Sequence, residues 1–528
     1  ALRGGWRQGA ICRAITWLRQ NFRQSRGYRA WLAWGGPDNL VENSGYARAL
    51  HALGRGLERV GDWLRESLFY RLLAAIRDGY LKISANSRVL SAVNRLSLRQ
   101  WLLAAFGFYL PVEYLIRDTL HLTLVSAVWE EAFIILALGL VLWRRALRQT
   151  TALRRETGLD AWLLLFFSGG FLLMSLVRPY PEVALPGYRI VVQYLLWYFI
   201  ILRLLENDRD FQVLYGALLA VAVIITLHGI YQYIIGVEIP AHWVSQTEMG
   251  VRTRVFSLTG SPNIMGSLLV LTAPLAAAGI YYCKRPLVKF LCFALVGLML
   301  LALLFTFSRG AWIGMIVAVL IFALFADKRL IALMGLAAAG VLVFVPSITS
   351  RITYLFTQDF AEASAIGGRA MRWETGRLLL TENNPWFGYG LGRFGGAVAM
   401  NNQLLDETET FRYFYMDNYY LKTMVEMGYI GLICYALLLL ALLWLGIKAI
   451  QRSDVSFAGL PGDALTRAVG NKRLLAVALF SGMLGVLVHC FFENIFEEPY
   501  MNSYFWAMAA MLIYLGFFRS NHSKGADK

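Results

Sequence analysis

Long uncharged stretches recur along this chain, and they constrain its fold more than any other feature. Residues 311–326 and 431–445, for example, contain no charged side chain. A helix that crosses about 30 Å of hydrocarbon needs about 20 predominantly apolar residues, and the chain repeats such stretches many times. The pattern predicts an all-α polytopic membrane protein.

The composition agrees with this prediction. The 528 residues are 58% hydrophobic and 16% charged, whereas soluble proteins are roughly 45–50% apolar and about 25% charged. This difference excludes a soluble multidomain enzyme, a disordered protein and a disulfide-stapled secreted fragment.

About twelve transmembrane helices are expected, nine within residues 101–346 and three within residues 418–518. The first is interrupted by Pro111 and Glu113. The predicted spans are 101–116, 121–143, 160–177, 187–205, 211–235, 262–282, 287–307, 311–326, 330–346, 418–446, 474–492 and 500–518.

The positive charge is distributed as in a membrane protein. The chain has 50 Lys and Arg against 34 Asp and Glu, a net charge of +16. Many of the basic residues lie in short connections between spans and so do not form one continuous basic groove. No nucleic acid is therefore expected as a partner. With both termini cytoplasmic, the inner connections and the tail 519–528 hold 20 basic residues, and the short outer connections hold six. The positive-inside rule therefore favours this orientation in a bacterial cytoplasmic (inner) membrane.

Residues 1–100 lie outside the predicted spans and hold 17 basic and 6 acidic side chains. Part of this region is amphipathic, which favours cytoplasmic or membrane-surface helices on anionic lipid over a loosely ordered cytoplasmic arm. On one helical face lie Leu68, Leu72, Leu73 and Ile76, whereas Arg65, Arg71 and Arg77 lie elsewhere.

Residues 347–417 form a second non-membrane part, which the predicted topology places on the extracytoplasmic side. The loop contains 6 basic and 8 acidic residues and several aromatic ones. Loops of this length are usually functional or disordered, and the aromatic residues argue against disorder.

Neither the cysteines nor the histidines form a recognisable metal-binding pattern. The five cysteines include no CxxC pair, and the six histidines lack HxxxH or HxH spacing. The cysteines read as small hydrophobic residues, and neither a metal nor another cofactor is expected.

The informative charges lie at the predicted outer ends of spans. Arg252 and Arg254 precede the sixth span, and Arg309 ends the seventh. Ser261-Pro262-Asn263 has the residue types of a helix start, whose free N–H groups favour an anion. Guanidinium groups nearby favour phosphate or diphosphate. The alternative is that each arginine snorkels to the interface or pairs with a carboxylate such as Glu426.

The long loop carries two further motifs and ends in a carboxylate. Gly368-Arg369-Ala370-Met371-Arg372-Trp373 comes first, followed by the glycine- and aromatic-rich segment 384–392. Asp417 lies where the loop meets the tenth span. Its carboxylate is suited to a general base facing a cationic pocket, or to the N-cap of the helix that follows.

Together these motifs resemble the O-antigen ligase/polymerase family of membrane glycosyltransferases. The resemblance covers roughly residues 100–515 and rests on the order, spacing and common side of the motifs. These are Arg254 with Ser261-Pro262-Asn263, Ser308-Arg309-Gly310, Gly368-Arg369…Trp373, Pro385…Gly388-Tyr389-Gly390 and Asp417-Asn418…Leu421…Glu426…Gly428.

The resemblance implies transfer of a glycan from an undecaprenyl-diphosphate carrier to an acceptor hydroxyl, without a metal, in polysaccharide biosynthesis at the outer membrane face. Ligases of this family have a histidine just before the asparagine of the last motif, where this chain has Asp417. The resemblance thus leaves open a polymerase, or a ligase whose acceptor is a glycan, a protein or another cell-envelope polymer.

The residues can be assigned roles on this basis. Leaving diphosphate needs positive charge, which Arg254 and Arg309 would supply, and Asp417 would accept the proton of the attacking hydroxyl. Arg369 and Trp373 would position the glycan. The remaining candidates for substrate binding are Arg252, Ser261, Asn263, Asn418 and Glu426.

The alternative function is a secondary transporter or a flippase for lipid-linked sugars. Many transporters have twelve helices, and Glu130, Glu131, His228 and His489 are ionisable residues within predicted spans. The absence of internal symmetry and the gathering of candidate residues on one side argue against it.

Overall fold

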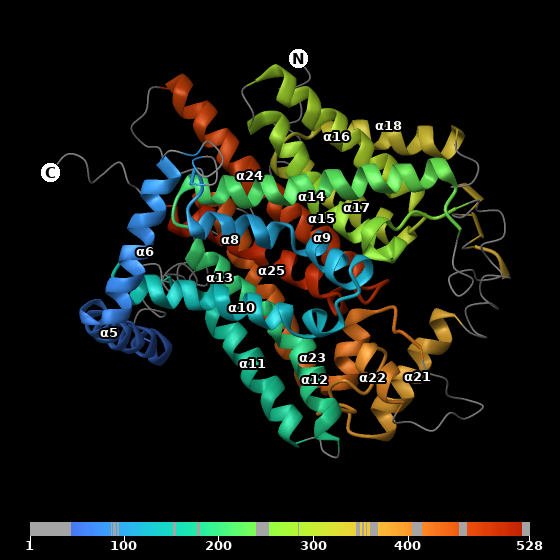
Figure 1. Cartoon of the computed structure of the whole chain (residues 1–528). Helices are drawn as coiled ribbons and strands as arrows, with labels where there is room; N and C mark the ends of the chain where they lie inside the picture. Colours follow the sequence, from blue (N-terminus) through green and yellow to red (C-terminus); the bar gives the residue numbers. More distant parts are fainter. Residues whose placement is uncertain are drawn as a thin grey trace, which may run out of the picture.

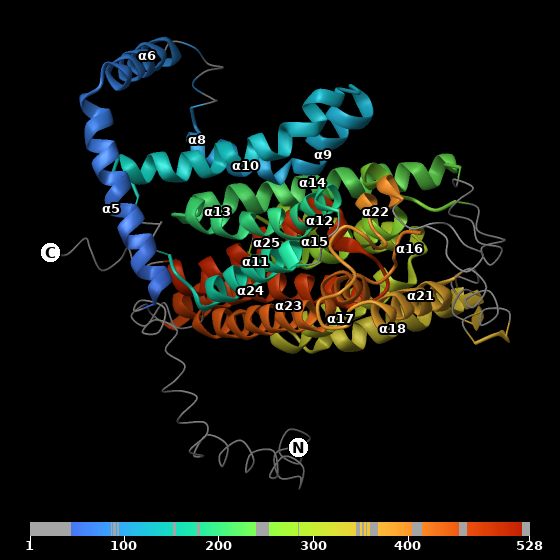
Figure 2. The ribbon, with the colours of Figure 1, turned by 90° about the horizontal axis from the view of Figure 1, so that it is seen from below.

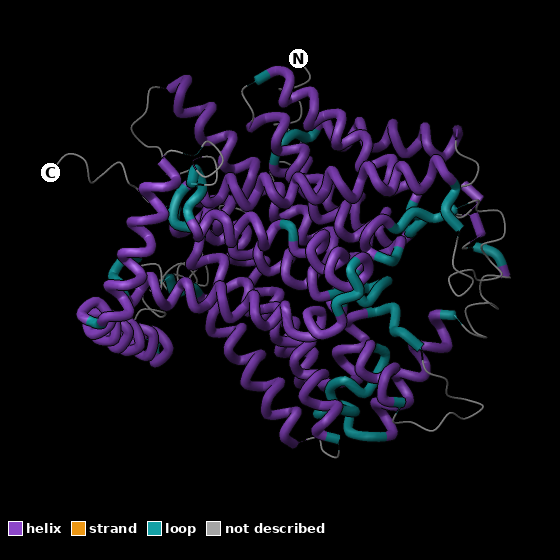
Figure 3. Tube along the Cα trace, viewed as in Figure 1, coloured by secondary structure: helices purple, strands orange, loops and turns teal. Residues whose placement is uncertain are grey.

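The computed structural model describes residues 44–85, 87, 91, 94–150, 155–176, 180–238, 253–282, 285–344, 349–350, 353–354, 356–358, 368–403, 414–453 and 462–519. Every regular element in these ranges is a helix (Figure 3). The predicted all-α fold is thereby confirmed for the described part of the chain.

Helices occupy every predicted span. They are α8 (Leu98–Gly107) with α9 (Tyr109–Tyr114) and η1 (Leu115–Thr119), α10 (Thr123–Ala146), α11 (Gly158–Leu176), α12 (Pro181–Val192) continued through η3 (Gln193–Leu195) into α13 (Leu196–Leu204), α14 (Asp208–Ile235), α15 (Pro262–Tyr282), α16 (Pro286–Phe305), α17 (Arg309–Phe325), α18 (Arg329–Phe344), α23 (Tyr419–Arg452), α24 (Gly462–His489) and α25 (Pro499–Ile513) with η8 (Tyr514–Phe518). Outside the spans lie α5 (Gly45–Glu66), α6 (Leu68–Ala85), η6 (Ser257–Thr259), α21 (Arg369–Glu382), α22 (Ala397–Asn402) and η7 (Ile495–Glu497).

Eight helical stretches among the described residues are long and apolar enough to cross a membrane, so the chain is a multi-pass membrane protein. Three further apolar helices, Arg309–Phe325, Arg329–Phe344 and Arg473–His489, are shorter. The expected first span is broken at Phe108 into helices of 10 and 6 residues. Helix length therefore does not support the count of twelve spans.

Local sequence signals set several helix boundaries. Asn207 and Asp210 form a reciprocal capping box at the start of α14, which ends at Gly236 in the left-handed conformation. Ser308 caps α17, where its hydroxyl accepts a hydrogen bond from the backbone N–H of Ala311. Proline occupies the first position of α15, α16 and α25, where its missing N–H has no cost.

The bundle is built around α15, α24 and α25. α24 packs against α15, α17 and α25, and α25 also packs against α13 and α23 (Figure 1). Figures 1 and 2 both show α5 and α6 at one end of the bundle, with α21 and α22 toward the opposite end. The end that carries α21 is the end where the candidate site lies.

Candidate active site

Several helices begin or end close together at the end of the bundle near α21. The backbone N–H of Tyr419, the first residue of α23, donates to the carbonyl of Cys490 just after α24. A side chain added at Gly310 in the first turn of α17 would touch His489 and Phe492. The starts of α17 and α23 therefore meet the segment that follows α24. Helix N-termini carry partial positive charge, so this end favours an anion.

Asp417 lies at this meeting point and is bound by two side chains of α21. Its Oδ2 accepts a hydrogen bond of 2.8 Å from Arg369 Nε, and its Oδ1 accepts one of 3.1 Å from Trp373 Nε1. Arg372 Nη1 lies 4.0 Å from Oδ2. The Asp417 side chain is 10% exposed. Charge-assisted hydrogen bonds of this kind contribute about 1.5–3 kcal/mol each, which holds the carboxylate in a fixed orientation.

Asn418, not Asp417, is the N-cap of α23. The Asn418 side chain accepts a hydrogen bond of 3.0 Å from the backbone N–H of Leu421. Because the neighbouring residue satisfies the helix end, the capping alternative for Asp417 is wrong, and its carboxylate instead faces the arginines of α21.

A second cluster surrounds Arg254 and Asn263. Arg254 Nε donates to the carbonyl of Thr306 at 3.1 Å, and Arg254 Nη2 lies 3.4 Å from Asn263 Oδ1. Asn263 Nδ2 donates in turn to Glu493 Oε2. Burial raises the pKa of Glu493 above its ordinary value, and the nearby Asp417 carboxylate adds to the increase.

Arg369 joins the two clusters. Its Nε binds Asp417, and its Nη2 donates to the carbonyl of Phe492 at 3.0 Å, one residue before Glu493. Residues 254, 263, 369, 373, 417 and 493, from segments far apart in the sequence, therefore form one connected site.

Sequence reasoning missed Glu493 as a member of this site. A signal was present, because Glu493 directly follows the predicted span 474–492 on the side where the other candidates were placed. The sequence Phe-Phe-Glu-Asn around Glu493 matches no recognised motif. Its hydrogen bond with Asn263 in the structure is what assigns Glu493 to the site.

Arg309 lies at the edge of the same site. Thr306, three residues earlier, binds Arg254, and Gly310, the next residue, packs on Phe492. The Arg309 side chain is half-buried. Arg252, predicted to bind substrate, lies outside the described residues.

Glu426 contributes to a different group of contacts. Its carboxylate is paired with Lys422 Nζ at 2.7 Å and accepts a hydrogen bond from the backbone N–H of Phe394. Lys422 also lies 3.3 Å from Glu497, whose Oε1 accepts from the backbone N–H of Ala397. These contacts fasten the segment around residues 394–397 to α23 and η7, which is a structural role for Glu426.

The site combines excess positive charge with buried carboxylates. Arg254, Arg309, Arg369 and Arg372 outnumber Asp417 and Glu493 by two charges when both acids are ionised. Such an arrangement suits a dianionic ligand and offers a carboxylate oxygen beside it. Within the described ranges, no group of three His, Cys, Asp or Glu side chains is placed to hold a metal ion.

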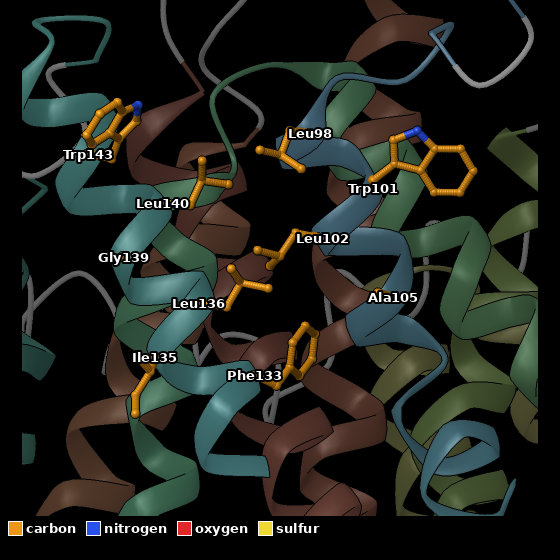
Figure 4. Close-up of a pocket in the computed structure, with 10 residues that line it drawn as sticks. All are labelled: Leu98, Trp101, Leu102, Ala105, Phe133, Ile135, Leu136, Gly139, Leu140 and Trp143. Atoms are coloured by element: carbon orange, nitrogen blue, oxygen red, sulfur yellow. The ribbon is translucent and has the colours of Figure 1, made fainter. Parts of the chain in front are cut away.

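An open apolar groove lies elsewhere, between α8 and α10 (Figure 4). Its lining carries no titratable side chain, so the groove suits hydrocarbon and not the reaction. It is lined by Leu98, Trp101, Leu102, Ala105, Phe133, Ile135, Leu136, Gly139, Leu140 and Trp143.

The fold and the site together define a multi-pass helical membrane protein with an arginine- and carboxylate-rich site at one end of its bundle. Residues 294–436 of the chain match the O-antigen ligase family. This match confirms the predicted resemblance over residues 294–436, which include Arg309, Arg369, Trp373 and Asp417. The motif of Arg254 with Ser261-Pro262-Asn263 lies outside the matched range. A search of curated proteins gave no significant match.

Proposed function

We propose that the protein transfers a glycan from an undecaprenyl-diphosphate carrier to an acceptor hydroxyl, without a metal ion. The observation that carries this proposal is the joining of Arg254, Arg369 and Asp417 into one site by way of Asn263 and residues 492–493. The match of residues 294–436 to the O-antigen ligase family supports the same reaction class.

The reaction is a displacement at the anomeric carbon of the first sugar. The acceptor oxygen forms the new glycosidic bond while the bond to the diphosphate oxygen breaks, and the diphosphate leaves with the bonding electrons. Asp417 accepts the hydroxyl proton, and Arg254 and Arg309 stabilise the charge that develops on the leaving diphosphate. Arg369 and Trp373 hold the Asp417 carboxylate in place and border the glycan.

The proposed setting is the outer face of a bacterial inner membrane, with both termini cytoplasmic and residues 347–417 outside. The distribution of Lys and Arg between alternate connections supports this orientation. Twelve crossings remain part of the proposal: α17, α18 and the apolar part of α24 would complete spans, and α8 with α9 would cross as a broken helix.

The test is glycan transfer by purified, reconstituted protein with a diphosphate-linked donor. Asp417→Asn is expected to lower the rate about 10²–10⁴-fold, the usual contribution of a general base. Arg309→Ala is expected to lower the rate about 10²–10³-fold, the usual cost of removing one group that stabilises charge in the transition state. Activity should persist in excess EDTA.

Arg377→Ala is the matched control, because Arg377 lies on α21 with Arg369 but is exposed and paired with Glu374. It should leave the rate unchanged. Full activity of Asp417→Asn or Arg309→Ala would refute the role assigned to that residue. Counterflow uptake of an unmodified solute, without transfer, would favour a transporter.

A further inference from the structure

Helices α5 and α6 run across the direction of the membrane-spanning bundle. In Figure 1, α6 crosses the direction of α8, α10 and α14, and in Figure 2, α5 does the same. Because spanning helices run roughly along the membrane normal, both helices lie roughly in the plane of the membrane. They lie at the end of the bundle opposite α21.

α5 is fixed tightly to the end of α10. Its buried residues are Ala47, Gly54 and Gly61, which recur every seven positions on one face. A Cβ at Gly61 would lie 1.9 Å from the carbonyl oxygen of Ala146, so the two backbones touch and only glycine fits there. α5 is therefore fixed to the end of α10, and α6 follows it directly in the chain.

Ion pairs reinforce this attachment. Glu58 pairs with Arg145, and Asp62 Oδ2 accepts a hydrogen bond of 2.8 Å from Arg148 Nη2. Both arginines follow or end α10, at the edge of the predicted span. α5 is thus attached to α10 through small residues and ion pairs. The apolar face of α6 takes no part in this attachment.

α6 exposes a continuous apolar face. Apart from α5, no described helix packs extensively against it. Leu68 is 81% exposed, Leu72 59% and Ile76 58%, and Phe69, Leu73 and Tyr80 are exposed beside them. At 100° per residue these six positions fall within less than half of the helix circumference, so they form a single face.

Positive charge borders this face on both sides. At the same angular spacing, Arg71 and Lys82 flank one edge of the face and Arg77 flanks the other. The acid of the opposite side, Asp78, is already paired with Arg77 at 2.8 Å. An apolar face with cationic borders complements lipid tails below anionic headgroups.

We propose that α6 is an interfacial helix that binds the anionic phospholipid surface at the end of the bundle opposite the active site, and that α5 holds it there. The apolar face would enter the boundary between headgroups and acyl chains, and Arg71, Arg77 and Lys82 would contact lipid phosphates. This role is independent of the transfer reaction.

The test uses the full-length protein in nanodiscs and a fluorophore on a single introduced cysteine. Leu72→Cys places the probe in the middle of the apolar face, and Asp78→Cys places it on the opposite side of the same helix. The parent protein, labelled identically, gives the background from natural cysteines. Quenching by lipids that carry a spin label just below the headgroup reports contact with the bilayer.

The expected result is strong loss of fluorescence at position 72 and little at position 78 in discs of phosphatidylcholine with phosphatidylglycerol. Replacing Arg71, Arg77 and Lys82 together by glutamate should restore most of the fluorescence at position 72 in these discs. Equal quenching at both positions, or a probe at position 72 that is shielded from water but not quenched by lipid, would overturn the proposal. The second outcome would indicate a protein partner or a second copy of the chain.

Discussion

At the scale of single residues, the site depends on side chains that hold other side chains. Asp417 is oriented by Arg369 and Trp373, and Arg254 is linked to Glu493 through Asn263. The sequence motifs predicted five of these six residues as functional, all except Glu493, because their types and common side were recognisable. The motifs did not predict which side chains contact one another, because the contact between residues 263 and 493 arises from the packing of α15 against α24.

Glu493 provides the prediction at this scale. Glu493→Ala removes the acceptor that orients Asn263, and a charge-assisted hydrogen bond is worth about 1.5–3 kcal/mol, so kcat/KM for the donor should fall about tenfold or more. Glu493→Gln should retain most of the parent kcat/KM, because its amide oxygen still accepts a hydrogen bond from Asn263 Nδ2. The measurement is steady-state transfer kinetics with varied donor.

Glu374→Ala serves as the control, since Glu374 is an exposed carboxylate on α21 whose partner is Arg377. The positioning role is contradicted if Glu493→Ala retains the parent kcat/KM, or if Glu493→Gln is as impaired as Glu493→Ala.

At the scale of elements, α23 shows what hydrophobic patterning predicts and what it omits. The uncharged stretch predicted a span over 418–446, and a helix begins at Tyr419 and continues to Arg452. Patterning did not reveal the interruption at Gly428, which has φ 68° and ψ −174°. Gly388 of the loop, also at positive φ, faces it so closely that neither position has room for a Cβ. This contact fastens the loop segment 384–390 to α23.

Gly428→Ala is therefore expected to be strongly destabilising. Its Cβ would lie 2.2 Å from the carbonyl oxygen of Trp386, and its backbone conformation is essentially restricted to glycine, which costs a substituted residue about 1–3 kcal/mol from strain alone. Thermal unfolding of purified protein should show a clear drop in Tm. Gly216→Ala in α14 has open space around the added methyl and should show no drop. Equal Tm values for the two variants would refute the assigned contact.

At the scale of the whole molecule, sequence reasoning predicted the helical fold and the position of each apolar segment. It misjudged the first segment, because a run that includes Pro111 and Glu113 folds as α8 and α9 separated at Phe108. It also said nothing of the arrangement of helices, since ridges and grooves on helix surfaces, not hydrophobicity, decide which helices pack together.

The proposed orientation predicts where a membrane-impermeant maleimide reacts. Glu382→Cys on α21 should react in intact cells, because this exposed position lies on the loop proposed to be outside. Arg55→Cys on α5, which is also exposed, should react after the membrane is made permeable and not before. The parent protein gives the background of natural cysteines. Labelling of Arg55→Cys in intact cells, with Glu382→Cys labelled only after permeabilisation, would contradict the proposed orientation.

The central claim is that Arg254 and Arg309 bind the diphosphate of a lipid-linked glycan donor, with its first sugar beside Asp417. The most direct measurement is a cryo-electron microscopy structure with bound donor. The account predicts phosphate density within hydrogen-bond distance of Arg254 and Arg309, and the first sugar beside Asp417. Density for the diphosphate at the opposite end of the bundle, or far from these arginines, would contradict it.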